Sequence, residues 1–333
     1  MTIDPIFGNS IEKDFDKFLE SSRKLSIKHF DNKIKFYTPS FINYEIPKIS
    51  QPHYSFPSIS ITGDYCALKC KHCDGKILKT MIPALTPEEL FDICRKLKAR
   101  GCLGCLISGG STPDGAVPLD KFSGALARIK RELGMMIVVH TGIVNSSTVK
   151  KLKDAGIDAA LIDIIGSDET IQEICQIKKT VRNFDQSMKI LREYEIPFVP
   201  HIIVGLHHGK LKGEFKAIEI ISKYNPAAIV IISFMPMIGT KMENIEPPVP
   251  EDIAKVIIST RYKLPDVPIV LGCVRPLGEH RIKTDILALR AGINGIAFPS
   301  EKAITFAKSI GLDASFSSIC CSQIYMEYGD KEV

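Results

Sequence analysis

The sequence lacks any apolar run long enough to cross a membrane, which takes roughly 18 or more residues. It also lacks blocks of like charge and low-complexity segments. Its first residues mix acidic and apolar side chains, whereas a secretory signal places a basic stretch before an apolar one. We therefore expect a cytoplasmic protein with neither a membrane anchor nor a basic tail for nucleic acid.

Cysteine is abundant, with 10 cysteines among 333 residues. In a reducing compartment, cysteines are more often metal ligands or catalytic groups than disulfide partners. The net charge of +5 is mild and only weakly favours an acidic partner or an anionic ligand. Metal or catalytic chemistry is thus the first expectation for the cysteines.

Short apolar runs alternate with amphipathic stretches along most of the chain, which is typical of repeated βα units. Eight runs are predicted strands: Ser58–Gly63, Leu103–Gly109, Met135–Thr141, Ala159–Ile164, Phe198–Gly205, Ala227–Phe234, Pro268–Cys273 and Gly295–Phe298. Thr86 as N-cap and Glu89 three residues later predict a helix over Pro87–Ala99. We expect a closed parallel (β/α)8 barrel of the TIM type, with a doubly wound open sheet as the alternative.

The barrel core is predicted over residues 56–311. Residues 1–55 are expected to pack on it as an N-terminal extension, with a helix at Ile11–Leu25 and a segment rich in Pro, Tyr and Phe at Phe36–Phe56. Residues 312–333 form a C-terminal tail that carries two adjacent cysteines.

Three cysteines, Cys66, Cys70 and Cys73, follow the first predicted strand, at the end of a barrel where catalytic residues gather. Three thiolates on one loop can hold three irons of a [4Fe–4S] cluster, which leaves the fourth iron open to an amino-carboxylate ligand. The alternative is a zinc knuckle. Structural zinc takes four ligands, and His72 is a poor fourth because it adjoins Cys73.

This loop and its position resemble the radical S-adenosylmethionine (SAM) superfamily. Leu106–Gly110, Gly205–Gly209 and Gly272–Gly278 are similar to recurring segments of its biotin synthase-like group, and within that group the chain resembles the two-component lipoyl synthases. The resemblance implies that the cluster cleaves SAM to a 5′-deoxyadenosyl radical, which abstracts hydrogen from an octanoyl chain before sulfur is inserted. The implied partners are an octanoylated lipoyl-carrier protein or peptide, a paralogous radical SAM subunit, and an electron donor such as ferredoxin or flavodoxin.

The resemblance also implies a SAM-binding set at the strand ends: His72, Ser108, Gly109, Gly110, His140, Asp163, Gly205 and Arg275. The chain departs from the family pattern at Ser111, where Glu usually follows the two glycines. Several of these assignments have a structural alternative, and His72 can be a surface histidine. His140 can be a core histidine, Arg275 can belong to a structural ion pair, and the glycines can form a plain turn.

Sulfur-inserting relatives sacrifice an auxiliary Fe–S cluster as the sulfur donor. We hypothesise that Cys273 with Cys320, Cys321 or both binds such a cluster, with Arg275, Ser317 or Ser318 as a non-thiolate ligand. Buried packing is the better interpretation for Cys102, Cys94 and Cys175, while Cys105 is held as a reserve ligand.

Two other functions compete with sulfur insertion into an octanoyl chain. The nearer one is biotin synthase, or another enzyme of the same group that makes a cofactor or methylates its target. The remote one is a non-catalytic Fe–S protein, which would not cleave SAM after reduction.

Overall fold

The computed structural model describes residues 13–39 and 55–328. Its centre is one sheet of parallel strands in the order β11-β1-β10-β9-β8-β7-β6-β5-β4-β2-β3. The strands are β1 (Lys33–Tyr37), β2 (Ser58–Ser60), β3 (Ile82–Pro83), β4 (Gly104–Ser108), β5 (Met136–His140), β6 (Ala159–Asp163), β7 (Phe198–Val204), β8 (Ile229–Ser233), β9 (Ile269–Leu271), β10 (Gly295–Ala297) and β11 (Asp313–Ser317).

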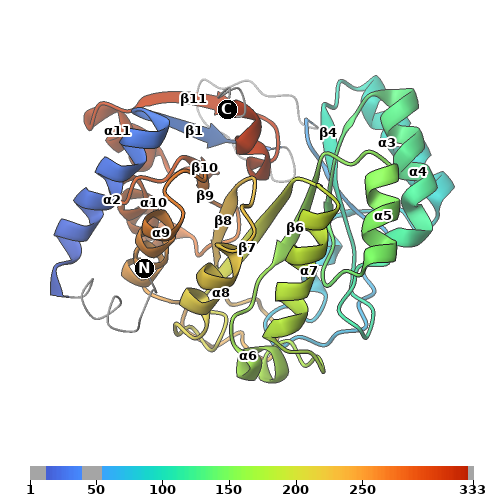
Figure 1. Ribbon diagram of the computed structural model, residues 1–333, viewed down its shortest axis with the longest axis horizontal. Coiled ribbons are helices and arrows are strands. Elements are labelled where there is room, and N and C mark those ends of the chain that lie inside the picture. The colour runs from blue at the N-terminus through green and yellow to red at the C-terminus, as the bar shows by residue number, and fades with distance from the viewer. Residues whose placement is uncertain (1–12, 40–54, 329–333) are drawn as a thin grey trace.

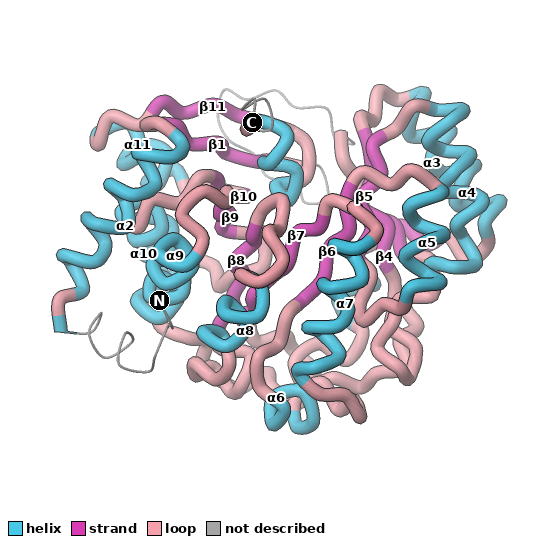
Figure 2. The backbone as a smooth tube through the Cα atoms, viewed as in Figure 1, coloured by secondary structure: helices cyan, strands magenta, loops and turns pink. Residues whose placement is uncertain are grey.

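Helices cover the outer face of the curved sheet (Figures 1 and 2). They are α2 (Phe15–Phe30), α3 (Pro87–Ala99), α4 (Ser123–Arg128), α5 (Ser146–Asp154), α6 (Asp168–Glu173), α7 (Val181–Glu193), α8 (Glu214–Ile221), α9 (Pro250–Lys263), α10 (Gly278–Arg290) and α11 (Glu301–Ser309). Shorter turns are η1 (Lys76–Thr80), η2 (Leu119–Phe122), η3 (Ile129–Leu133) and η4 (Cys321–Glu327). The predicted capping box of α3 is confirmed, because Glu89 N donates to Thr86 Oγ1 and Thr86 N donates to Glu89 Oε2.

The two faces of the sheet build two separate cores. The larger one lies between the sheet and the helices and includes Ile107, Ile137 and Ile162. The smaller one lies inside the curve of the sheet and includes Val138 and Leu161. Because neighbouring residues of a strand point to opposite faces, the even-numbered and odd-numbered positions of one strand serve different cores.

The C-terminal segment η4 fills part of this inner core. Ile324 is fully buried there, and Tyr325 Oη donates to the carbonyl oxygen of Asp158, at the start of β6, over 3.0 Å. Figure 1 shows η4 as the red turn inside the curve of the sheet. Cys320 and Cys321, where this segment begins, are therefore buried against the inner face.

The parallel α/β barrel architecture and all eight predicted strands are confirmed, but the expected closure is wrong. Among the described strands, β3 and β11 are the two edges and do not pair with each other, so the barrel is partial. The prediction placed β1 in an extension and β11 in a tail, yet β1 pairs with both β10 and β11. In the described sheet, β1 and β11 follow β10, so β10 does not pair with β2. A closed eight-stranded barrel would require that pairing.

The N-terminal helix also differs from its expected bounds, since α2 runs over Phe15–Phe30 and ends five residues later than predicted. The first residues of the expected helix and most of the segment rich in Pro, Tyr and Phe lie outside the described residues.

Candidate active site

The three-cysteine loop leaves the carboxyl end of β2 as the sequence predicts. Within it, the carbonyl oxygen of Cys70 accepts hydrogen bonds from the backbone N–H groups of Cys73 and Asp74, at 3.3 and 2.9 Å. These bonds form a tight turn that brings ligand atoms of Cys70, His72 and Cys73 within 4.8 Å of one another. Cys66 lies at the other end of the loop.

Two neighbouring segments hold this loop from outside. After β4, Ser111 O accepts from Ala67 N at 2.9 Å, and Ser111 N donates to Cys66 Sγ at 3.3 Å. After α6, Ile174 O accepts from Lys71 N at 2.8 Å. The loop is thus positioned by the backbone of two other βα units, which preorganises its thiols.

Without a metal, the Cys70 and Cys73 thiols are protonated. A hydrogen bond to the carbonyl oxygen of Cys175, together with burial, raises the pKa of Cys70, and contact with Cys70 together with burial raises the pKa of Cys73 to about 12. Binding of iron must therefore displace protons. Three thiols on one loop fit the donor set that Fe–S clusters require, so the residues present suit the implied group.

The Ser108-Gly109-Gly110 segment packs directly against the cysteine loop. Gly110 N donates to Thr62 Oγ1 at 2.6 Å, and a Cβ at Gly110 would overlap the carbonyl oxygen of Tyr65 and lie 2.5 Å from Cys66 Cα. Glycine is required here because of this close approach. The main chain of Ser111, rather than a glutamate side chain, contacts the loop.

Polar side chains form a layer on the inner face of the sheet. On each strand they lie two residues after an apolar residue of the inner core. His140 ends β5 and Asp163 ends β6, and His140 Nε2 lies 3.5 Å from Asp163 Oδ1. Burial disfavours the carboxylate, but His140 and His201 outweigh it and lower the pKa of Asp163 to about 2. His72 also contributes to this field from the cysteine loop. The predicted residues His72, His140 and Asp163 are thus brought together.

His201, on β7, belongs to this layer but is absent from the predicted set. Its Cα is the register partner of Asp163, and burial lowers the pKa of its imidazole to about 4. The signal that could have revealed it is a polar residue within the otherwise apolar Phe198–Gly205 run.

Gly205, just after β7, adopts a φ of 75°, and a Cβ there would lie 2.6 Å from Pro248 Cγ. Sequence reasoning missed its partner Glu214, whose carboxylate accepts from Gly205 N at 2.8 Å and from Lys212 N at 2.6 Å. Burial raises the pKa of Glu214 to about 7. This carboxyl group fixes the loop at the end of β7.

The second set of cysteines gathers on the inner side of the sheet. Cys273 follows β9, and Cys320 and Cys321 belong to the same inner cluster. Interaction with Cys321 and the hydrogen bond that Ser322 Oγ donates to Cys320 Sγ at 3.1 Å lower the pKa of Cys320 to about 7, against the effect of burial. Burial raises the pKa of Cys273 to about 11.

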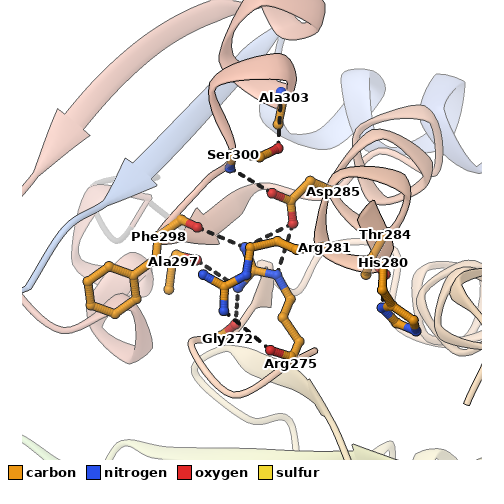
Figure 3. Close-up of polar contacts among 10 residues, drawn as sticks. All are labelled: Gly272, Arg275, His280, Arg281, Thr284, Asp285, Ala297, Phe298, Ser300 and Ala303. Atoms are coloured by element: carbon orange, nitrogen blue, oxygen red, sulfur yellow. Dashed lines mark hydrogen bonds and ion pairs between the residues drawn. The ribbon is translucent and has the colours of Figure 1, made fainter. Parts of the chain in front are cut away.

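Arg275 is not free to bind a ligand in this structure, and its structural alternative is supported (Figure 3). Its Nε donates to Asp285 Oδ1 at 2.9 Å, and its terminal nitrogens donate to the carbonyl oxygens of Gly272, Ala297 and Phe298 at 2.7–3.0 Å. One terminal nitrogen also pairs with Asp285 at 2.9 Å. All five N–H donors of the guanidinium thus face protein acceptors.

Cys105 is no reserve ligand for the inner cluster. It is completely buried between the sheet and α3, with its Sγ 3.9 Å from that of Cys94. The prediction failed because Cys105 points to the outer face of β4, whereas the next residue, Leu106, packs on the inner one.

The fold is a parallel α/β partial barrel, and a loop with three cysteines follows its strand β2. Residues 60–212 match the model of the radical SAM superfamily. The match runs from the end of β2 past the end of β7 and so includes the cysteine loop. This part of the chain is therefore similar to the radical SAM superfamily.

Curated relatives are distant. The chain is 28% identical to the biotin synthase of Leptospira biflexa over 222 residues, which are 65% of this chain and 62% of that protein. It is 24% identical to the 7,8-didemethyl-8-hydroxy-5-deazariboflavin synthase of Methanopyrus kandleri, covering 69% of this chain and 74% of that protein. The chain thus spans less than two thirds of the biotin synthase that it matches.

Among solved structures, methylornithine synthase aligns with a TM-score of 0.60 and 15% identity over 90% of this chain and 89% of that one. At this identity the likeness concerns the fold. No helix in the described part of the chain is long and apolar enough to cross a membrane.

Proposed function

We propose that this protein is a radical SAM enzyme that inserts sulfur into a protein-bound octanoyl chain, as one subunit of a two-component lipoyl synthase. The observation that carries the proposal is the second set of thiols, Cys273, Cys320 and Cys321, on the same inner face as the polar layer. Sulfur insertion at an unactivated carbon needs a sulfur source beside the substrate, and buried thiols in that position suit an auxiliary Fe–S cluster.

The residues present fit such a cluster in their donor chemistry. Cys320 has a pKa of about 7, so a large fraction of it is thiolate at neutral pH, which is the form that ligates metals. Ser317 and Ser318 remain as predicted non-thiolate ligands, whereas Arg275 would have to give up a buried hydrogen bond. When bound at the first loop, the implied [4Fe–4S] cluster and SAM supply the 5′-deoxyadenosyl radical.

The protein's own contribution is orientation and exclusion of water. The Gly110 contact and the Ser111 main chain fix the cysteine loop, and the Glu214 carboxyl group fixes the end of β7. An octanoylated carrier protein or peptide, a paralogous subunit, and ferredoxin or flavodoxin are the partners that this proposal requires.

The similarity to biotin synthase favours a second candidate, sulfur insertion into dethiobiotin. The two candidates share the auxiliary cluster and differ in substrate. Reduced, reconstituted protein is therefore incubated with SAM and either octanoyl-lysyl peptide or dethiobiotin, and the thiolated products are measured by mass spectrometry. A thiolated octanoyl peptide supports the first candidate, and biotin or thiolated dethiobiotin supports the second.

The auxiliary cluster is tested separately by iron counting with Mössbauer spectroscopy. We expect about eight irons per chain, as two four-iron clusters, and about four after Cys273→Ala or Cys320→Ala. Cys105→Ala is the matched control, because this thiol lies in the outer core. About four irons in the unaltered protein, with SAM cleavage but no thiolated product, would discard both the auxiliary cluster and sulfur insertion.

A further inference from the structure

Three adjacent strands present His140, Asp163 and His201 on the inner face of the sheet. Asp163 and His201 are register partners, and His140 pairs with Leu161, two residues before Asp163. Since side chains two residues apart share a face, the three side chains form one layer directly above Val138, Leu161 and Val199. They stand on strands rather than loops, so their relative positions are rigid.

The three side chains are close enough to share one ion. One ligand atom from each lies within 4.8 Å of the other two. His201 Nδ1 lies 3.1 Å from the carbonyl oxygen of Val199, to which it donates in the neutral ring, leaving Nε2 with a free lone pair. Histidines that ligate metals usually donate their other ring nitrogen to such an acceptor, which fixes tautomer and orientation.

We propose that His140, Asp163 and His201 bind a divalent first-row transition-metal ion, separate from the cysteine-bound clusters. Two imidazoles and one carboxylate are a ligand set that such ions accept while keeping further coordination positions open.

The open coordination positions face the inner side of the sheet, where the substrate of a radical SAM barrel must reach the cysteine loop. A metal ion there would hold a carbonyl or carboxylate oxygen of the substrate and orient the chain beside it. This inference is independent of the substrate proposed above, since it concerns the binding of a metal ion by three side chains and does not depend on which substrate is used.

Two other arrangements compete with this site. Asp163 and His140 can instead contact the SAM ribose, as the resemblance implies, and that role does not need His201. Glu169, Glu173 and His207 also form a compact group. That group is half-exposed and already paired with Lys71, Lys212 and His208, so it suits a surface ion-pair network.

The test uses Mn²⁺, which prefers nitrogen and oxygen ligands to thiols. Manganous chloride is titrated anaerobically into the reconstituted, oxidised enzyme, whose [4Fe–4S] clusters are diamagnetic, and free Mn²⁺ is measured from its six-line EPR signal. We expect one tightly bound Mn²⁺ per chain. Asp163→Asn, His201→Gln and His140→Gln should each weaken binding by roughly tenfold or more, whereas Glu169→Gln should not.

The iron content and SAM affinity of each variant are measured in parallel. A variant that has lost both is misfolded, and the conclusion then rests on the other two variants. Absence of stoichiometric Mn²⁺ binding to the unaltered enzyme overturns the proposal, as does binding that is lost in Glu169→Gln and kept in His201→Gln. A SAM affinity that falls in Asp163→Asn but not in His201→Gln, without Mn²⁺ binding, assigns Asp163 to the ribose instead.

Discussion

Gly110→Ala should disable the enzyme by displacing its cysteine loop. The new Cβ would overlap the carbonyl oxygen of Tyr65 and lie 2.5 Å from Cys66 Cα, whereas ordinary contact begins at 3.4 Å. To remove the contact with Cys66 Cα, Cys66 must move by roughly 0.9 Å, from 3.4 − 2.5 Å. Cys66 carries the first thiol of the loop. Gly110 is not among the glycines with positive φ, so alanine adds a clash but no backbone strain.

A displacement of this size exceeds the roughly 0.5 Å within which a functional site must be held. Misplacement by about 1 Å can lower a rate on the order of 100-fold. We therefore expect SAM cleavage to 5′-deoxyadenosine to fall by about that factor, with less iron bound at the first loop. The assay is iron per chain after reconstitution, followed by 5′-deoxyadenosine yield under dithionite.

Gly124→Ala is the matched control for this variant. A Cβ at Gly124 meets nothing within 4 Å, and the residue lies in α4, where alanine is favoured over glycine by about 0.5–1 kcal/mol. This control should keep full activity. If Gly110→Ala also retains the iron and SAM cleavage of the control, then the close approach of the two segments does not position the loop, and our reasoning fails.

Three further predictions concern stability and iron. Burial raises the pKa of Glu214 from 4.5 to about 7, so the stability that its proton provides below pH 4.5 is lost as pH rises through about 7. Glu214→Gln should remove this part of the pH dependence of Tm. Asp285→Asn leaves the Arg275 guanidinium buried without its anion and should lower the unfolding free energy by about 3–5 kcal/mol, measured with denaturant. The exposed pair Asp16–Arg290 is its control, since Asp16→Asn should cost less than about 1 kcal/mol. Cys105→Ala should leave iron per chain unchanged, and a loss of iron would return this cysteine to the metal sites.

The strands that carry the site were predictable because their signals are local. Each is a short apolar run bounded by polar residues, and the cysteine loop follows the first run directly. The edge strands were not predictable in the same way. In β1 (Lys33–Tyr37), lysines alternate with apolar residues, which a surface segment also shows, and its place between β10 and β11 is a long-range choice.

The fate of Arg275 illustrates a second limit of sequence reasoning. Its position after a strand at the reactive end and the family resemblance predicted a ligand contact. What decides its role is the set of carbonyl oxygens at Gly272, Ala297 and Phe298, which two separate strand ends bring together. Main-chain acceptors have no sequence signature, so a buried arginine that they satisfy cannot be told from one that awaits a ligand.

Strand alternation divides the cysteines of this chain into two groups, and this division gives the proposals their physical basis. Cys105 points outward from β4 against Cys94 of α3, and both cysteines are completely buried there. Cys273 lies on the inner side, in the same cluster as Cys320. Under the proposed function, a sulfur donor would have to lie on the inner side, where the polar layer of His140, Asp163 and His201 stands. If an auxiliary cluster donates the sulfur, the iron content per chain should therefore depend on Cys273 and not on Cys105.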